Sequence, residues 1–345
     1  MSDTSPFTED NPQQIECSYI NNFDIAQVIE FWNQSKYPRH KRQPAYMENF
    51  EKLVFAKAFF DPHGFIIARR GTDIVGFAHA GFAPNSDGSD LDYSYGVIPM
   101  ICYNDEQADV ILDALISACE SYLRGKGAKK FQLGAYYPQA PFYLGMIRAC
   151  ELPGIFLDET ALVEAAQRHG YMLTSPSTHY RRNLEDLNWT FDHDIRALRR
   201  KYNIQMEYCP TPSEWVKAIA MSGIIWSYFS LVEAGRGQIS SSDSIANCAL
   251  WVIDDLPMGD LTVVGISQFY VAPEHRGQQL GFFLLTEVLR RLVDQHVAGV
   301  QFQILDEHEK LKSMLEAKKF EPFKRSALFV KENQNEDSVS DSDAQ

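Results

Sequence analysis

Two segments far apart in the chain constrain the fold most strongly: AKKFQLGAY (Ala128–Tyr136) and GVQFQILDE (Gly299–Glu307). Both alternate apolar and polar residues, as strands do. Each follows a long stretch with the apolar spacing of an amphipathic helix. The apolar positions of the two helical faces are Ala108, Ile111, Leu112, Leu115, Cys119 and Leu123 in the first half, and Leu285, Val288, Leu289 and Leu292 in the second. The chain therefore contains one helix–strand pattern twice.

The segments around this pattern also repeat. A strand that ends near a proline precedes each helix, in YGVIPM with Pro99 and in FYVAP with Pro273. A further helix follows each alternating strand, near 159–169 and near 307–318, and leads into the segments MLTSPSTHYRRNL and EPFKRSALFVKE. A strand–helix–strand connection with a long crossover implies parallel strands. We therefore predict an α/β fold (α+β, with mixed sheets), built as two tandem domains that each have a central sheet flanked by helices.

The chain length and the composition of its ends predict the domain boundaries. A chain of 345 residues is longer than one hydrophobic core usually organises. We expect a disordered N-terminus at 1–14, a first domain at 15–186, a second domain at 187–332 and an acidic disordered tail at 333–345. The segment LEDLNWTFDHD separates the two domains, and both ends are polar.

Charge and cysteine content limit the partners of the protein. The 32 basic and 46 acidic residues give a net charge of −14, which argues against nucleic acid or an anionic membrane and would attract a cationic amine. The six cysteines have no CxxC spacing, so no metal site is predicted. Scattered thiols without a signal peptide, and no apolar run long enough to span a membrane, predict a cytoplasmic protein.

The loop after the second proline carries the strongest functional signal. The strand leaves through Val271-Ala272-Pro273, and the segment EHRGQQLG then leads directly into a helix. The N-terminus of a helix has unpaired backbone N–H groups and a partial positive charge. Glycines let a phosphate approach those groups closely, so the loop is suited to bind a pyrophosphate.

In this loop the sequence resembles the GNAT superfamily of acyl-CoA-dependent N-acetyltransferases, whose signature Q/R-x-x-G-x-G/A follows a V-x-P strand end. Here Arg276-x-x-Gln279-x-Gly281 matches at Arg276 and Gly281, whereas Gln279 replaces the usual glycine. The resemblance implies that a coenzyme A pyrophosphate binds here. The coenzyme-binding residues that it implies are Tyr270, Val271, Arg276, Gly277, Gln278, Gln279, Leu280, Gly281 and Phe282.

The corresponding segment of the first half, MICYNDEQADV, lacks both arginine and glycine. We expect Asn104 to cap the helix, with Gln107 three residues later as in a capping box. Asp105 and Glu106 would then lie in the first helical turn and repel a pyrophosphate. The first half is therefore predicted to be a degenerate copy that does not bind the coenzyme.

The resemblance also implies direct attack of an amine on the thioester. A backbone N–H at Tyr270 or Val271 would stabilise the oxyanion, and the pantetheine arm would lie where the strands ending at Val271 and Leu305 diverge. The candidate catalytic residues are Glu307, Asp306 and, through a water molecule, Gln268; His275 is a further candidate base. Many members of the family use a tyrosine as acid, but the matching segment MLEAKKF has Leu315 at that position.

Three further segments have less specific meanings. YPRHKR (37–42) is a basic cluster that could bind an anion, but a solvated loop is the simpler interpretation. AYYPQAPFYLGM (135–146) gathers aromatic residues after a predicted strand and could build an acceptor site or pack between the domains. The stripe Phe50, Phe55, Phe59 and Phe60 is expected in a core.

The sequence thus predicts an acyl-CoA-dependent N-acyltransferase, similar to tandem acetyltransferases of the mycothiol-synthase type. Acetyl-CoA or another acyl-CoA would be the co-substrate, without a metal, and a small-molecule or peptide amine would be the acceptor. Nucleic acid and membrane are not expected as partners, and the oligomeric state stays open. The alternatives are a non-catalytic CoA-binding or scaffold protein that keeps the fold, and a nucleotide-phosphate protein of another fold.

Overall fold

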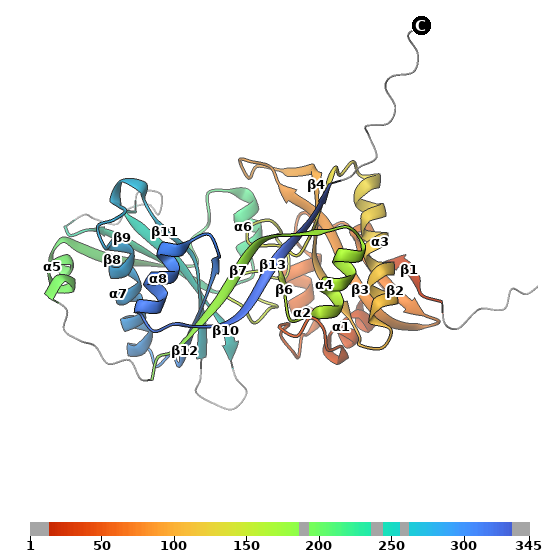
Figure 1. The fold of residues 1–345 in the computed structure, drawn as a ribbon, viewed down its shortest axis with the longest axis horizontal. Coiled ribbons are helices and arrows are strands. Elements are labelled where there is room, and N and C mark those ends of the chain that lie inside the picture. Colours follow the sequence, from red (N-terminus) through yellow and green to blue (C-terminus); the bar gives the residue numbers. More distant parts are fainter. Residues whose placement is uncertain (1–13, 186–192, 236–243, 256–261, 333–345) are drawn as a thin grey trace, which may run out of the picture.

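The computed structural model describes residues 14–185, 193–235, 244–255 and 262–332. These form a mixed α/β structure in which helices flank one large sheet (Figure 1). The elements of the first half are β1 (Glu16–Tyr19), α1 (Ile25–Gln34), α2 (Met47–Phe50), η1 (Glu51–Phe55), η2 (Pro62–Gly64), β2 (Phe65–Arg70), β3 (Asp73–Pro84), β4 (Leu91–Tyr103), α3 (Ala108–Gly125), β5 (Lys130–Leu133), β6 (Ile155–Phe156), α4 (Thr160–Arg168) and β7 (Met172–Asn183).

The second half repeats much of this order. Its elements are α5 (His193–Lys201), β8 (Tyr202–Tyr208), α6 (Trp215–Met221), β9 (Trp226–Glu233), β10 (Ala246–Asp255), β11 (Thr262–Val271), η4 (Pro273–His275), α7 (Leu280–Asp294), β12 (Gly299–Leu305), α8 (Glu309–Ala317) and β13 (Glu321–Glu332). The helices and strands predicted around both alternating segments are confirmed, with α3 and α7 as the crossover helices.

The two predicted strand–helix–strand units form the two parallel pairs of the sheet. β4 pairs with β5 and β11 pairs with β12 in parallel, and the other pairs are antiparallel. The strand order is β1-β2-β3-β4-β5-β13-β7-β12-β11-β10-β9-β8, and β6 pairs with β13 beside this path. Each half therefore has the mixed sheet that the sequence predicts.

The two halves exchange strands where they meet. β13, the last strand of the second half, lies between β5 and β7 of the first half. β7 in turn pairs with β12 of the second half along its whole length from Gly299 to Leu305. Figure 1 shows β7 and β13 running together from one half to the other. The predicted boundary at 186–187 lies outside the described residues and stays a prediction.

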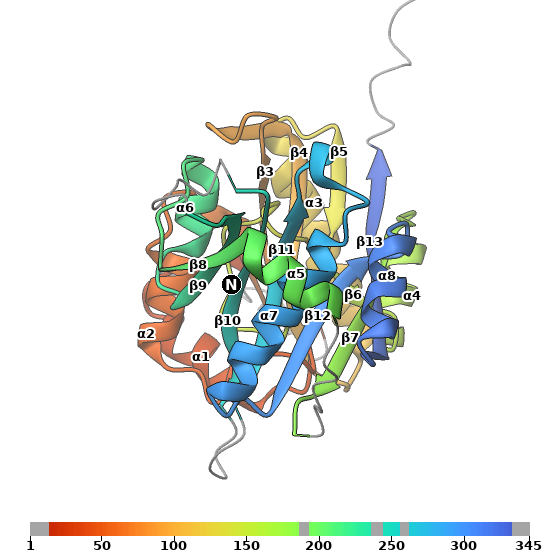
Figure 2. The same ribbon diagram turned by 90° about the vertical axis from the view of Figure 1, so that its left-hand side faces the viewer.

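The predicted helical faces lie in separate hydrophobic cores. Ile111, Leu112 and Leu115 of α3 are fully buried against the first half of the sheet. α7 lies over β11 and β12 (Figure 2), and its Leu285, Val288 and Leu289 are buried in the core of the second half. The expected aromatic stripe from Phe50 to Phe60 belongs to a third core on the other face of the first half.

Two local expectations for the first half are wrong. β4 does not end near Pro99 but continues to Tyr103, although its parallel pairing with β5 stops at Ile98–Leu133. Pro99 lies in the β-bulge between His79 and Gly81 of the β3–β4 ladder, where a residue without an N–H group is tolerated. α3 begins at Ala108, after Gln107, so Asn104 is not its cap. Asp105 therefore precedes the helix and forms an ion pair of 2.7 Å with Lys36.

The basic segment 37–42 is not the solvated loop that its composition indicates. Lys41 is buried, and its Nζ donates to the Ser35 carbonyl at 2.6 Å. The Arg42 guanidinium donates to the Ile253 carbonyl of β10 at 2.9 Å, which connects the two halves. Lys57 makes a second connection, since its Nζ donates to the Ile219 carbonyl at 2.6 Å. Burial lowers the pKa of Lys57 to about 8.

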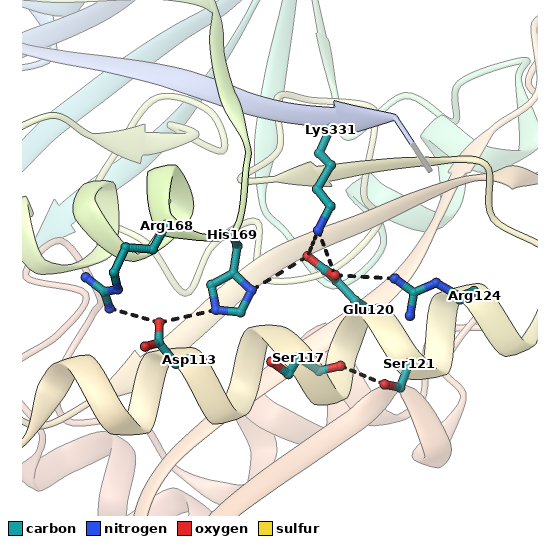
Figure 3. A network of polar contacts seen from close by, with 8 residues as sticks. All are labelled: Asp113, Ser117, Glu120, Ser121, Arg124, Arg168, His169 and Lys331. Atoms are coloured by element: carbon teal, nitrogen blue, oxygen red, sulfur yellow. Dashed lines mark hydrogen bonds and ion pairs between the residues drawn. The ribbon is translucent and has the colours of Figure 1, made fainter. Parts of the chain in front are cut away.

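An ion-pair network fastens the exchanged strand β13 to α3 (Figure 3). Nζ of Lys331 donates to both carboxylate oxygens of the buried Glu120, at 2.9 Å each. Arg124 and His169 lie 3.5 and 3.9 Å from the same carboxylate. A strand of the second half thereby supplies the closest cation to a buried acid of the first half.

We predict that Lys331→Met lowers the free energy of unfolding by about 1–2 kcal/mol, because a hydrogen-bonded ion pair is lost while Arg124 still faces the carboxylate. Urea unfolding at neutral pH measures the change. Lys310→Met, at an exposed position of α8, is the matched control and should change stability by less than about 0.5 kcal/mol. Equal effects of the two substitutions would contradict a stabilising role of the network.

Candidate functional site

The two parallel strands of the second half stop pairing with each other before either strand ends. Their last paired residues are Ile266 and Phe302. Beyond them β11 stays paired with β10 as far as Val271, whereas β12 stays paired with β7 as far as Leu305. The strands diverge as the sequence predicts. From Ser267 and Gln303 onward their backbones no longer pair with each other.

A β-bulge lies at the point of divergence. Gln268 and Phe269 of β11 together oppose Cys248 of β10, so the ladder skips one position. Gln268 has φ of 52°, in the left-handed region that an L-residue enters at a cost. Its side-chain Nε2 is buried and, within the described part of the chain, has no hydrogen-bond partner. A strained backbone and an unpaired amide thus coincide at one residue, a combination typical of functional sites.

The segment between β11 and α7 is held by its own side chains. Nε of Arg276 donates to the Val271 carbonyl at 3.0 Å, and Nε2 of Gln278 donates to the Glu274 carbonyl at 3.2 Å. Gln279 caps the helix in the left-handed conformation, with φ of 59°. This backbone conformation explains why the signature usually has glycine at the position.

The N-terminus of α7 is open to a ligand. The first turn contains no acidic residue, and Gln279 makes no side-chain capping bond. Across the ranges that the structure describes, the N–H groups of 277–282 have no hydrogen-bond acceptor in the protein. Gly277, Gln278 and Gln279 are exposed. The loop therefore offers several free donors at the positive end of a fifteen-residue helix.

The remaining residues of the predicted coenzyme loop support its shape. A Cβ atom at Gly281 would lie 3.1 Å from Cγ2 of Val271, so this glycine lets α7 approach β11 closely. Leu280 is buried in the core, and the Phe282 ring lies 3.7 Å below Nζ of Lys318. Tyr270 is 45% exposed beside the loop. The structure thus brings all nine predicted residues to one end of β11.

The predicted catalytic carboxylates lie at the end of β12 and have different environments. Asp306 accepts hydrogen bonds from Oγ1 of Thr178 at 2.6 Å and from the Arg325 guanidinium at 2.8 Å. Burial raises the pKa of Asp306, but these two bonds together with the positive charges of Lys312 and Arg325 outweigh it and hold the pKa below the ordinary value. Glu307 is exposed just before α8. An ion-paired aspartate is a weak base, so the structure favours Asp306 less than the sequence does.

A carboxylate that sequence reasoning missed lies directly on the bulge. Glu151 belongs to the loop between β5 and β6, in the first half of the chain. Oε1 of Glu151 accepts a short hydrogen bond from Oγ of Ser267 and one of 3.3 Å from the N–H of Gln268. The residue is half-buried, and desolvation raises the pKa of its carboxyl group. Cys150 next to it packs on Gly265, where a Cβ atom would lie 2.6 Å from the Cys150 Cα.

The aromatic segment before Glu151 packs, which is one of the two roles that the sequence left open; its role in an acceptor site stays a prediction. Phe142 and Tyr143 are buried in the core of the first half around His79. Tyr136 reaches β7, where its hydroxyl donates to the Ser175 carbonyl at 2.7 Å. The Tyr137 hydroxyl is buried without a partner among the described residues. Most of the segment therefore packs within the first half, whereas Tyr137 packs against a cluster that contains Trp226 and Trp251 of the second half.

The corresponding place in the first half is filled. Only a cavity of about 20 Å³ remains where β4 and β5 stop pairing, and Leu152, Pro153 and Gly154 line it. Gln107 has the same left-handed conformation as Gln279, with φ of 55°, but Arg70 donates to its side chain at 2.6 Å. The two halves thus share a backbone geometry, but the side chain of the left-handed glutamine is hydrogen-bonded by an arginine in the first half and makes no capping bond in the second.

No group of three or more His, Cys, Asp or Glu side chains in the described ranges is arranged to hold a metal ion. No helix in those ranges combines the length and apolar character that crossing a bilayer requires.

Comparison with known proteins identifies the domain type. Residues 226–316 match the family described as Acetyltransferase (GNAT) family, a range that includes the bulge, the loop and α7. No curated protein sequence matches the chain. A solved tandem GNAT protein from the clavulanic acid biosynthesis pathway is similar over 92% of this chain and 98% of its own, with a TM-score of 0.63 and 13% identity.

Two further solved structures are similar. One is a GCN5-related glucosamine N-acetyltransferase region of a fungal multi-domain β-N-acetylglucosaminidase, at 16% identity and a TM-score of 0.62 over 95% of this chain and 40% of that one. The other is Saccharomyces cerevisiae N-myristoyltransferase with bound myristoyl-CoA, at 9% identity and a TM-score of 0.52 over 95% and 84%. At these identities the likeness establishes a shared fold.

We predict that Glu151→Gln makes the protein more stable than the wild type at pH 8 but not at pH 4. Burial raises the pKa of Glu151 in the folded state. Below the ordinary glutamate pKa the group is neutral in both states and costs no stability. As the pH rises through the raised pKa, the buried carboxyl group must ionise and the free energy of unfolding falls. Glutamine keeps the acceptor oxygen for Ser267 without the charge. Urea unfolding at both pH values measures the difference, with the exposed Glu164→Gln as control; a pH-independent difference would contradict the raised pKa.

Proposed function

Because the chain is a tandem-domain protein of the GNAT superfamily, we propose that its second half binds acyl-CoA and transfers the acyl group to an amine by direct attack. Acetyl-CoA is the proposed co-substrate, and no metal takes part. The single observation that carries the proposal is the set of unpaired N–H groups at 277–282, at the N-terminus of α7. A pyrophosphate would satisfy them, and the helix dipole would add about 0.3–1 kcal/mol per well-placed charge.

The divergence of β11 and β12 supports the position of the pantetheine arm. A thioester chain needs backbone partners along an extended path, and the strand edges released beyond Ile266 and Phe302 supply them. An N–H group near the end of β11, at Tyr270 or Val271, would face the thioester carbonyl and stabilise the oxyanion. The coenzyme would then run from the loop at 276–282 to the bulge at Gln268.

The first half is proposed to be the degenerate copy. Its counterpart of the coenzyme loop has no glycine and is followed by Asp109 in the first turn of α3, which would repel a phosphate. Ile147, Leu152 and Pro153 line the cavity of about 20 Å³ where β4 and β5 diverge, which is too small for a pantetheine arm. Its proposed contribution is structural and, through the loop that carries Glu151, to the acceptor side of the second half.

The proposed acceptor is a small-molecule or peptide amine. Two of the similar structures are named as N-acyltransferases, a glucosamine N-acetyltransferase region and an N-myristoyltransferase. The net charge of −14 favours a cationic acceptor and disfavours nucleic acid and anionic membranes. A cytoplasmic location is proposed with it, because acetyl-CoA and reduced thiols coexist there.

A non-catalytic CoA-binding or scaffold protein is the second candidate. Leu315 lies where many members of the family have a catalytic tyrosine, and it is fully buried. A thiol of pKa about 8.5 is a fair leaving group, so its release needs little help from an acid. The absence of a tyrosine at position 315 is therefore compatible with catalysis. The tandem GNAT fold excludes the third alternative, a nucleotide-phosphate protein of another fold.

We predict that Gln279→Glu weakens acetyl-CoA binding at least about tenfold, or 1.4 kcal/mol, without loss of stability. The added charge lies at the N-terminus of α7, where it suits the helix dipole but repels a pyrophosphate. Isothermal titration calorimetry with acetyl-CoA measures the affinity, and thermal unfolding measures stability. A weaker affinity together with unchanged or higher thermal stability would show that the substitution removes the binding site and does not damage the fold.

Gln295→Glu is the matched control, because it places the same charge at the other end of the same helix. It should leave the affinity unchanged and slightly lower stability. Unchanged affinity in Gln279→Glu would refute the assigned loop. Thiol release from acetyl-CoA over a panel of amines then separates the two candidate functions, since tight binding without turnover favours the non-catalytic one.

A further inference from the structure

The loop that carries Glu151 covers the face of β11 opposite to α7. Val264 and Ile266 point into the core beneath α7. The alternate residues Gly265 and Ser267 point the other way and contact Cys150 and Glu151. A thioester that enters between β11 and β12 from the α7 end would therefore meet Glu151 at the opposite face.

Glu151 has the environment of a base rather than of a structural ion pair. Its two hydrogen-bond donors, the Ser267 hydroxyl and the Gln268 N–H, are neutral. Among the described residues no cation forms an ion pair with it, in contrast to Asp306, which faces Arg325 and Lys312. The titratable groups that its charge affects are Cys150, Tyr136 and Tyr137. In each of them burial raises the pKa most, and the nearby Glu151 carboxylate raises it in addition.

Resting on the proposed function, we propose that Glu151, supplied by the degenerate first half, is the general base of the reaction in the second half. The amine nitrogen attacks the thioester carbonyl, and a C–N bond forms. The excess proton of that nitrogen passes to Oε of Glu151, and the C–S bond breaks with its electron pair leaving on the coenzyme A sulfur. The protonated Glu151 then returns its proton to this thiolate or to water, so the enzyme is regenerated without another reactant.

Unpaired polar atoms around Glu151 mark where the acceptor would lie. The Tyr137 hydroxyl, Nε2 of Gln268 and Oε1 of Gln303 are buried and lack partners among the described residues. Buried polar groups are nearly always paired in a complete complex. A primary amine carried on a polar, hydroxyl- or carbonyl-bearing molecule would satisfy all three, whereas a purely alkyl amine would leave them unpaired.

The test compares the wild type with Glu151→Gln and Ser267→Ala in full-length protein. Acetyl-CoA is the donor; glucosamine, spermidine, a lysine-containing peptide and hexylamine are the acceptors, and hydrolysis by water is followed in parallel. We expect Glu151→Gln to lower kcat by about 10²–10⁴-fold with unchanged acetyl-CoA affinity by calorimetry. Its kcat/KM should lose the rise with pH that titration of Glu151 causes in the wild type.

Ser267→Ala supplies a readout that a structural role would not produce. The Ser267 hydroxyl lowers the pKa of Glu151 against the effect of burial. Its removal should move the acidic limb of the pH profile to higher pH while activity at high pH persists. Glu164→Gln, on the exposed side of α4, should leave activity and pH profile unchanged.

Each outcome decides one of the two claims. Wild-type rate and pH profile in Glu151→Gln would overturn the base assignment while the transferase stands. Tight acetyl-CoA binding without turnover of any amine or water would overturn the assignment too and support the non-catalytic alternative. If the wild type does not bind acetyl-CoA, the proposed function itself fails.

Discussion

The pairing of exchanged strands at the centre of the sheet is the constraint on which the rest depends. β13 pairs with β5, β6 and β7, and β7 pairs with β12, so neither half has a complete sheet without the other. Two independent domains joined by a linker would move relative to each other by default. Here a continuous backbone ladder sets the register between the halves, and the Lys331–Glu120 ion pair holds the end of the exchanged strand.

This register gives the second half a site that is built from both. The loop after β5 reaches β11, where Cys150 packs on Gly265 and Glu151 accepts a hydrogen bond from Ser267. Buried side chains secure the approach: Leu144 packs with Trp226 and Trp251 of the second half. Glu151 consequently reaches the bulge at Gln268. In the proposed reaction, the half that is proposed not to bind the coenzyme supplies this loop to the site of the other half.

The proposed coenzyme loop and the proposed base differ in how far the sequence can point to them. The loop has a local signal, because V-x-P, Arg276, Gly281 and an amphipathic helix are adjacent in the chain. A prediction from them does not depend on tertiary contacts. The proposed base is a different case. Glu151 and Ser267 are 116 residues apart, and a single glutamate in an irregular loop has no periodicity or motif. The sequence pointed instead to Asp306 and Glu307, which are close in sequence to a strand end.

The sequence by itself determined three features: the doubled strand–helix–strand pattern, the cores beneath α3 and α7, and the open helix terminus after β11. Each of them follows from the spacing of residues that are close in the chain. Only the tertiary structure decided which strands pair between the halves, that the basic segment at Lys41 and Arg42 is internal, and that Glu151 meets β11. Backbone hydrogen bonds are alike for every strand, and burial of a charge depends on distant carbonyls. Neither the pairing of distant strands nor the burial of a charge can therefore be inferred from residues that are neighbours in the sequence.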